Sequence, residues 1–211
     1  MEVRNSSAVS TRSLLYTIGH SNHGARDFLA LLERHGVTAI ADVRSVPQSR
    51  FNPQFGRKAL ERTLEERGIA YLFLGEELGA RSADPACYRD EKVQYDRLAR
   101  SAPFQRGLEG LREATARQRL AVMCAEREPL ECHRAILIAP QMVASGIAVE
   151  HILADGGLET HEQAIERLIR QLGLAQDLFQ TRDALIAQAL SIQGERIAYT
   201  RPADRRKRSS S

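Results

Sequence analysis

Residues 123–134 (MCAEREPLECHR) concentrate the side chains most capable of chemistry. In chain order they are Cys124, Glu126, Cys132, His133 and Arg134. The last three open a predicted helix, and a helix N-terminus binds anions and lowers the pKa of a thiol placed there. The Arg134 guanidinium adds a planar fork of donors suited to phosphate or carboxylate. The segment therefore predicts a loop that holds an anionic group against a reactive thiolate.

The same residues allow other chemistries. Both cysteines, His133 and Glu126 are competent metal ligands, so a zinc or iron site is one alternative. Seven residues separate the cysteines, however, and neither a compact finger spacing nor a close Cys-x-x-C redox pair is present. We therefore predict no metal ligand and leave the cofactor unassigned. A buried, inert Cys124 at the end of an apolar strand is the plainest alternative.

Further polar residues follow predicted strands. His20 and Ser21 come after an apolar run, and Asp42, Arg44 and Ser45 come at the end of a second. In an open parallel sheet, ligands bind beyond the carboxyl ends of the strands. We therefore expect these side chains to share one crevice with Cys124 and Glu126. A helix cap at Ser21 and a structural Asp42–Arg44 ion pair are the alternatives.

The elements that must position these residues alternate between strand and helix patterns. Short apolar runs predict strands at residues 14–19, 37–43, 69–74, 120–124 and 147–153. Helical periodicity predicts helices at residues 25–34, 57–67, 91–100, 103–117, 132–145 (with a kink at Pro140) and 159–172. This alternation predicts an α/β fold, a three-layer Rossmann-like domain with a mostly parallel sheet of about five strands.

Each candidate residue receives a predicted role from its chemistry. Cys124 or Cys132 is the nucleophile if one is used, and His20, Asp42 or Glu126 moves protons. The predicted catalytic set is Cys124, Glu126, Cys132, His133, His20 and Asp42. The predicted ligand-binding set is Ser21, Arg44, Ser45, Ser49 and Arg134. If the protein is an enzyme, these types fit a transferase or a hydrolase.

Composition bounds the class of protein. The chain has 211 residues, of which 43% are hydrophobic and 27% charged, and three are cysteines. No apolar run approaches the ~20 residues of a membrane span, and no secretory signal is evident, so we expect a cytoplasmic protein without a membrane partner. Residues 1–12 are predicted to be a disordered leader, 13–194 a single α/β domain, and 195–211 a basic disordered tail. The sequence does not define the oligomeric state.

A nucleic-acid-binding module is the second functional hypothesis. The tail is rich in arginine, and residues 44–58 interleave basic side chains with Phe51 and Phe55. Such a pattern is suited to stacking on single-stranded bases. The structural alternative is that the two phenylalanines anchor their loop to the core.

The motifs resemble a known family. YTIGHSN (16–22), DVRSVPQS (42–49), the stretch from Tyr71 to Gly75 and MCAEREPLECHR (123–134) are similar to the family called domain of unknown function 488. The resemblance runs in order from about residue 16 to 172, and Gly79-Ala80 departs from a double glycine common in the family. The motif positions carried over are Gly19, His20, Ser21, Asp42, Arg44, Pro47, Ser49, Cys124, Glu126, Cys132, His133 and Arg134. The resemblance implies a compact α/β domain with a site at these positions, and it supplies no reaction.

A weaker likeness links the strand ending in Asp-Val-Arg, with a later strand that delivers a cysteine, to rhodanese-like sulfurtransferases. Cys124 lacks the tight loop of those enzymes, and no arginine follows it at six residues. Our leading prediction is an enzyme-like site for an anionic, phosphate-bearing or nucleotide-like ligand. Nucleic-acid binding, sulfur transfer and a metal site are the alternatives.

Overall fold

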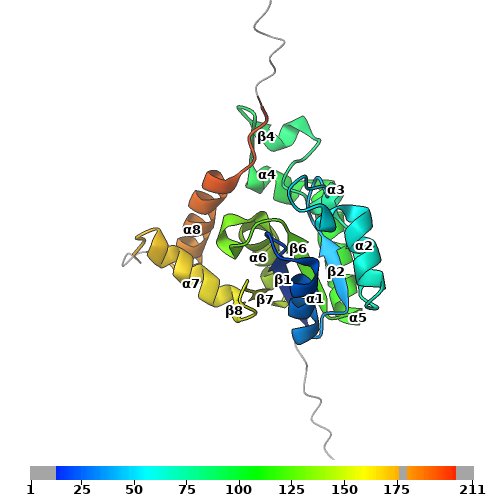
Figure 1. Cartoon of the computed structure of the whole chain (residues 1–211). Helices are drawn as coiled ribbons and strands as arrows, with labels where there is room; N and C mark the ends of the chain where they lie inside the picture. Colours follow the sequence, from blue (N-terminus) through cyan, green and yellow to red (C-terminus); the bar gives the residue numbers. More distant parts are fainter. Residues whose placement is uncertain (1–12, 176–179, 203–211) are drawn as a thin grey trace, which may run out of the picture.

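A single six-stranded sheet forms the centre of the protein (Figure 1). The structure is a computed structural model that describes residues 13–175 and 180–202. The strand order is β3-β2-β6-β1-β7-β8. The strands are β1 (Leu14–Gly19), β2 (Ala39–Asp42), β3 (Ala70–Phe73), β6 (Leu120–Cys124), β7 (Ala148–Ile152) and β8 (Leu158–Thr160). All neighbouring strands are parallel except β7 and β8, so five carboxyl ends lie at one edge of the sheet.

Alternation along the central strands sends side chains to two separate cores. In β6, Leu120 and Val122 join one apolar cluster, whereas Ala121 and Met123 join the other. Successive side chains of a strand point to opposite faces, so a strand buried on both sides must be apolar throughout. This is why β1, β2 and β6 appear in the sequence as continuous apolar runs.

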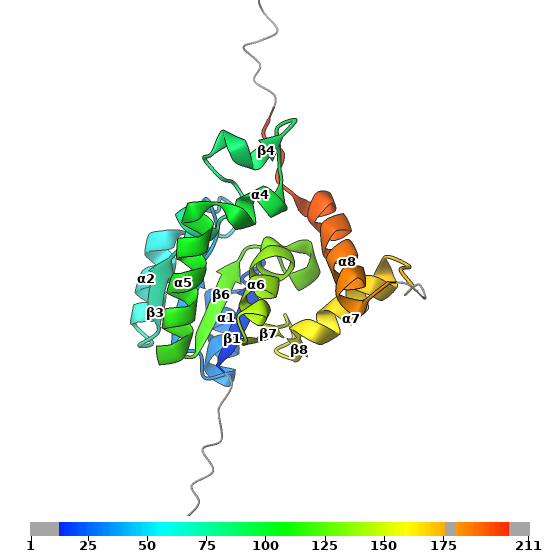
Figure 2. The same cartoon turned by 180° about the vertical axis from the view of Figure 1, so that it is seen from behind.

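Helices cover both faces and complete three layers (Figure 2). On one face lie α1 (Ala25–Arg34) and α2 (Arg57–Glu65), whose leucines pack against Ile40 and Met123. On the other lie α5 (Ala102–Arg117) and α6 (Ala139–Ala144), which contribute Leu108, Leu111 and Met142. The predicted three-layer, mostly parallel α/β fold is confirmed.

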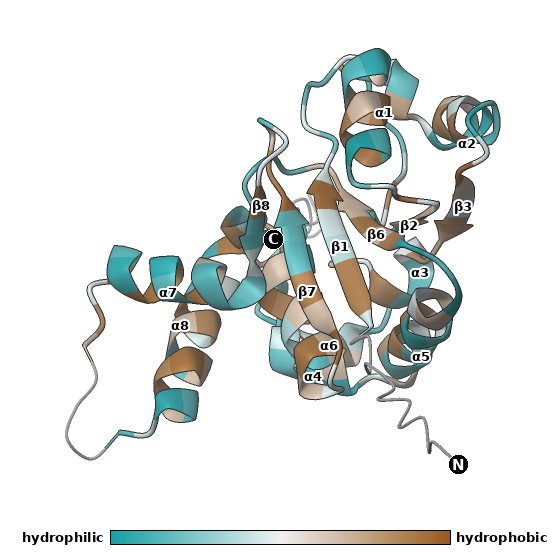
Figure 3. Ribbon diagram, turned by 90° about the horizontal axis from the view of Figure 1, so that it is seen from below, coloured by the Kyte–Doolittle hydropathy of each residue, from teal (hydrophilic) through white to brown (hydrophobic). Residues whose placement is uncertain are grey.

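Two further helices extend the fold beyond the sheet. Helices α7 (His161–Gln171) and α8 (Arg182–Ile197) project to one side (Figure 3), and their apolar residues form a third cluster with Leu130 and Ile136. The remaining elements are short. They are α3 (Gly75–Leu78), α4 (Tyr95–Arg100), the hairpin of β4 (Tyr88–Arg89) and β5 (Lys92–Val93), the 3-10 helices η1 (Pro53–Phe55), η2 (Pro85–Cys87) and η3 (Pro129–Glu131), and the π-helix η4 (Arg134–Ile138).

Three predicted elements differ from those observed. The helix predicted from residue 159 is preceded by a sixth strand, β8, because Gly156 at φ +82° permits a turn back along β7. The helix predicted from residue 91 begins at Tyr95, since Asp90 and Glu91 have positive φ and form the tip of the β4–β5 hairpin. The helix predicted over 132–145 opens as the π-helix η4 and continues as α6, with Pro140 in its first turn.

The predicted tail begins within ordered structure. Helix α8 continues to Ile197, Thr200 forms a bridge with Lys92, and the Arg201 amide donates to the Glu91 carbonyl. These backbone hydrogen bonds order residues beyond 195, against the prediction. The predicted leader (1–12) and residues 203–211 of the tail lie outside the described residues. Within the described part of the chain, no helix has the length and apolarity of a membrane span. A single domain over 13–194 stays a prediction.

Candidate active site

A cavity of about 470 Å³ opens at the carboxyl ends of the central strands. Strand β6 pairs with both β1 and β2, so Gly19 lies beside Cys124 and Asp42 beside Met123. The loops that leave these ends supply most of the wall. Its lining residues are His20, Ser21, Arg44, Ser45, Val46, Gln48, Ser49, Asn52, Ala80, Arg81, Tyr95, Cys124, Ala125, Glu126, Glu131, Cys132, His133, Ile197 and Tyr199.

Most of the predicted site residues meet in this cavity. Nine of the eleven line it: His20, Ser21, Arg44, Ser45, Ser49, Cys124, Glu126, Cys132 and His133. Asp42 and Arg134 do not line it, because both are fully buried behind the wall. Their predicted roles in proton transfer and ligand binding stay predictions, and their contacts in the structure are with neighbouring residues of the wall.

Asp42 holds Arg44 from behind. Arg44 donates from Nε to Asp42 Oδ1 at 2.9 Å and from Nη2 to Oδ2 at 2.6 Å, and the Tyr71 hydroxyl donates to Oδ2 at 2.8 Å. Burial works against the charged form of Arg44, but the hydrogen bonds and charge of Asp42 raise its pKa above its usual value. Burial together with Asp42 raises the pKa of Tyr71 as well. The alternative of a structural Asp42–Arg44 ion pair thus describes what these residues do, while one edge of Arg44 still faces the cavity.

His20 has a defined tautomer. Its Nε2 lies 3.1 Å from Arg44 Nη1, and because a guanidinium can only donate, Nε2 is the acceptor. The Nδ1 proton is then donated to the Ser21 carbonyl at 2.9 Å. Burial lowers the pKa of His20 to about 4, with a contribution from Arg44. The ring stacks on Phe55 at 4.3 Å between centroids, which fixes its orientation.

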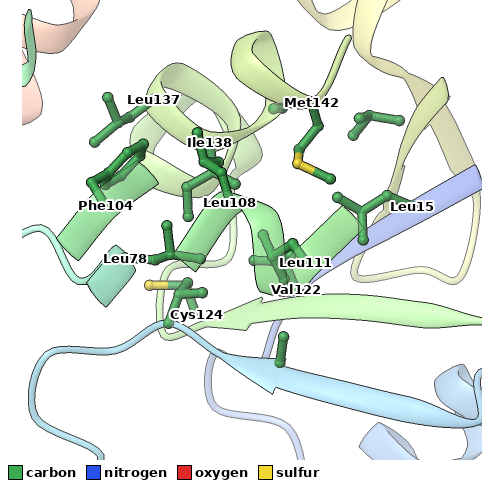
Figure 4. Packing of buried hydrophobic residues seen from close by; sticks show 14 of the residues in the cluster. Leu15, Leu78, Phe104, Leu108, Leu111, Val122, Cys124, Leu137, Ile138 and Met142 are labelled. Atoms are coloured by element: carbon green, nitrogen blue, oxygen red, sulfur yellow. The ribbon is translucent and has the colours of Figure 1, made fainter. Parts of the chain in front are cut away.

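Two thiols and a carboxylate meet at the floor of the cavity. Cys124 donates to Glu126 Oε2 at 2.9 Å, and Cys132 Sγ lies 3.1 Å from the same oxygen. The Nδ1 atom of His133 lies 3.7 Å from both sulfurs. Cys124 also belongs to the apolar cluster under β6, near Leu78 (Figure 4). The inert-thiol alternative therefore describes only one side of Cys124, because its other side faces polar partners.

The pKa values of the two thiols are shifted in opposite directions. The neighbouring Cys132, and burial, raise the pKa of Cys124 well above its usual value. Burial opposes the Cys132 thiolate, but the neighbouring Cys124 and the charges of Arg134 and His133 lower its pKa well below its usual value. Burial, then the Cys132 charge, raises the pKa of Glu126. The surroundings therefore favour the charged form of Cys132 and the neutral form of Glu126.

Arg134 supplies positive charge without contacting the cavity. Its Nη1 donates to the Glu126 carbonyl at 2.8 Å and its Nη2 to the Arg127 carbonyl at 3.1 Å, whereas Nε has no partner among the described residues. No carboxylate pairs with it in the described part of the chain. A buried cation without a paired carboxylate favours anions nearby. Arg134 thus fixes the Glu126 segment and stabilises negative charge at the floor.

The comparisons with known proteins identify the family. A family model described as "Domain of unknown function DUF488" matches residues 24–139, more than half of the chain. This chain belongs to the DUF488 family. No curated protein and no solved structure matches it. The match in this DUF488 protein includes the predicted site residues from Asp42 to Arg134, whereas His20 and Ser21 precede it.

The two phenylalanines of the nucleic-acid hypothesis differ in their exposure to solvent. Phe55 is buried and packs edge-on against Phe28 at 5.1 Å, so it anchors its loop as the structural alternative proposed. Phe51 is 95% exposed. Arg57 lies over the Phe73 ring at 4.4 Å. A shared stacking platform therefore has no support in this DUF488 chain.

Several lining residues escaped the sequence reasoning. Arg81, Tyr95 and Tyr199 come from a loop, a helix start and the segment after α8, and none follows a strand of the central sheet. Arg81 lies over the Tyr199 ring at 4.5 Å, and its amide donates to Ser45 Oγ at 3.0 Å. Only the tertiary structure brings these segments to the cavity.

Proposed function

We propose that the cavity is the substrate site of an enzyme, a transferase or hydrolase, which acts on a small molecule carrying an anionic group such as a phosphate. One observation carries this proposal. Glu126, the two thiols and His133 line the same cavity as the arginine and serine side chains of its wall. Concave sites with a few convergent polar groups and perturbed pKa values are characteristic of active sites.

Donors in the wall support an anionic ligand. A guanidinium has five N–H donors, and Asp42 and His20 occupy three of those of Arg44. Ser45 Oγ accepts from the Arg81 amide and Ser49 Oγ from the Asn52 amide, so both hydroxyl protons remain free to donate among the described residues. Arg81 adds a second guanidinium at the cavity wall. The set is suited to charge-assisted hydrogen bonds with phosphate oxygens.

The floor group supplies the acid–base capacity. Glu126 is buried beside the thiols, and burial raises its pKa toward the range in which a carboxyl can give and take a proton at neutral pH. In this proposal the wall holds the anionic group and Glu126 transfers the proton of the reacting bond.

Binding is tested with inorganic phosphate and AMP as probes, by calorimetry and by the shift in thermal unfolding. We expect Arg81→Gln, and separately Ser45→Ala with Ser49→Ala, to weaken binding at least about tenfold, because a hydrogen bond to a charged group contributes ~1.5–3 kcal/mol. Arg106→Gln on α5, away from the cavity, is the matched control. Absence of binding, or equal affinity in all variants, would contradict the anionic ligand.

Turnover is tested with p-nitrophenyl phosphate and its diester. We expect Glu126→Gln to lower the rate at least ~100-fold, as for loss of a general acid–base group. No turnover on either ester would contradict the hydrolase half of the proposal, and the transferase half then requires an acceptor substrate.

A further inference from the structure

Three potential ligand atoms for a metal ion meet at the floor of the cavity. The sulfurs of Cys124 and Cys132 and an imidazole nitrogen of His133 all lie within 4.8 Å of one another. All three side chains are buried, and all three line the cavity. Oε2 of the Glu126 carboxylate lies within hydrogen-bonding distance of both sulfurs.

The spacing fits a tetrahedral ion. Bond lengths of ~2.3 Å to sulfur and ~2.0–2.1 Å to imidazole nitrogen place the sulfur and nitrogen of a tetrahedral zinc site ~3.5 Å apart. The observed distances from His133 Nδ1 to the two sulfurs are both 3.7 Å. Two equal distances of this size, from two cysteines on different elements, match the edges of such a polyhedron.

Hydrogen bonding alone leaves this group poorly satisfied. Both thiols contact the same oxygen of Glu126, and a thiol is a weak donor. His133 Nδ1, the ring nitrogen that faces the sulfurs, has only these two contacts, each 3.7 Å long. Buried polar atoms are normally paired, so this arrangement calls for a further partner between the sulfurs and the ring.

The charges around the group accommodate a divalent cation. Two thiolates would neutralise the ion, and the charge of the Glu126 carboxylate would be offset by the buried Arg134. The guanidinium of Arg134 donates to the backbone carbonyls of Glu126 and Arg127 and pairs with no carboxylate among the described residues. Thiolate and imidazole ligands together favour zinc over magnesium or calcium.

We propose that Cys124, Cys132 and His133 bind one divalent metal ion of the zinc class and leave a fourth position open to the cavity beside Glu126. Three protein ligands with an open position are typical of catalytic rather than structural zinc sites. A zinc ion here would supply an activated water, and Glu126, which stands beside the open position, would accept its proton. What the metal does rests on the proposed function, whereas its binding stands independently.

The test measures metal in protein purified without chelator and again after reconstitution with zinc. We expect about one zinc per chain in the wild type, and at least ~100-fold weaker affinity when a ligand is lost in Cys124→Ser, Cys132→Ser or His133→Asn, because even second-shell losses weaken metal sites 10–100-fold. Cys87→Ala, at a buried cysteine outside the group, is the matched control and should retain its zinc.

Cobalt replacement keeps the test decisive if a variant fails to fold. Wild-type protein loaded with Co²⁺ should show intense thiolate-to-cobalt absorption in the near ultraviolet. No zinc after reconstitution and no such absorption would overturn the inference, as would a wild-type mass lower by two hydrogens that reports a Cys124–Cys132 disulfide in place of a metal. Phosphate binding without zinc would contradict this inference alone, and zinc binding without phosphate binding would contradict the proposed function alone.

Discussion

At the scale of single residues, Asp42 determines what Arg44 can do. The carboxylate is fully buried and accepts the Arg44 amide and two guanidinium donors, together with the Tyr71 hydroxyl. One edge of Arg44 is thereby fixed, which leaves the other edge oriented toward the cavity. A buried ion pair of this kind is a positioning device more than a source of net stability.

Removing the charge of Asp42 should therefore destabilise the fold. We expect Asp42→Asn to lower the free energy of unfolding by ~3–5 kcal/mol, because it leaves a buried guanidinium without its anion. The control is Asp96→Asn in the exposed Asp96–Arg100 pair, which should change stability by less than ~0.5 kcal/mol. Urea denaturation followed by circular dichroism measures both. Similar effects of the two substitutions would contradict the assigned role of Asp42.

At the scale of elements, the end of β1 packs closely against the loop after β6. A Cβ at Gly19 would overlap the backbone oxygen of Glu126 and crowd the Arg134 guanidinium. The same loop is tied to β1 by the hydrogen bond from the Ser21 amide to the Ala125 carbonyl, at 2.9 Å. The position of Glu126 therefore depends on the absence of a side chain on a neighbouring strand.

A pair of glycine substitutions tests this contact. Gly19→Ala should lower stability by ~1–3 kcal/mol, the usual effect of overpacking, and should weaken zinc and phosphate binding by displacing Glu126. Gly110→Ala in α5 is the control, since a Cβ there meets nothing within 4 Å. It should raise stability by ~0.5–1 kcal/mol, as for glycine to alanine in a helix interior. The expectation is wrong if Gly19→Ala retains wild-type stability and binding.

Many of the secondary-structure elements can be predicted from the sequence because they depend on strong local patterns. The apolar runs of β1, β2 and β6 identify the parallel sheet, and the rule of strand carboxyl ends then brings His20, Arg44 and Cys124 together. Strand β8 was missed because three residues are too few for a pattern, and the glycines before it resemble a helix start. Its pairing with β7 is a tertiary contact.

The candidate site was predicted in location more than in detail. Residue type alone made Asp42 and Arg134 candidates for contact with a ligand, but it cannot distinguish the lining of a cavity from the layer behind it. Tyr95, Arg81 and Tyr199 gave no signal, since their segments reach the cavity only through packing. The seven-residue gap between the cysteines argued against a metal site, yet η3 and the strand end fold the two sulfurs back to the same carboxylate.

At the scale of the whole molecule, two buried histidines couple folding to pH. His151 on β7 and His161 at the start of α7 have ring nitrogens 3.2 Å apart. Burial lowers the pKa of His151 well below its usual value, and it lowers that of His161 to about 4. The folded protein therefore keeps both rings neutral in mildly acidic solution.

Charged groups around the two histidines also shift their pKa values. The neighbouring His161, and then Arg134 and Arg167, lower the pKa of His151 further, whereas Glu159 raises that of His161. Glu159 is engaged by Arg167 through two hydrogen bonds of 2.8 and 2.7 Å, which limits its effect on the ring. Burial thus remains the dominant influence on both histidines.

Stability should consequently decline as the pH falls. An unfolded histidine has a pKa near ~6.5, so between pH 6.5 and 4 the unfolded chain binds more protons than the folded one. For His161 this difference lowers the free energy of unfolding by about 2 kcal/mol between pH 7 and pH 5. Replacing His161 by Gln, which keeps a polar group facing His151, should remove about that part of the decline.

The half-buried His35, whose ring contacts the Gly156 carbonyl at 3.0 Å, supplies the control His35→Gln. Urea denaturation at a series of pH values from about 5 to 8 measures the slopes, since stability rises with pH wherever the unfolded state binds more protons. Equal slopes for wild type and His161→Gln would show that this histidine does not link folding to pH.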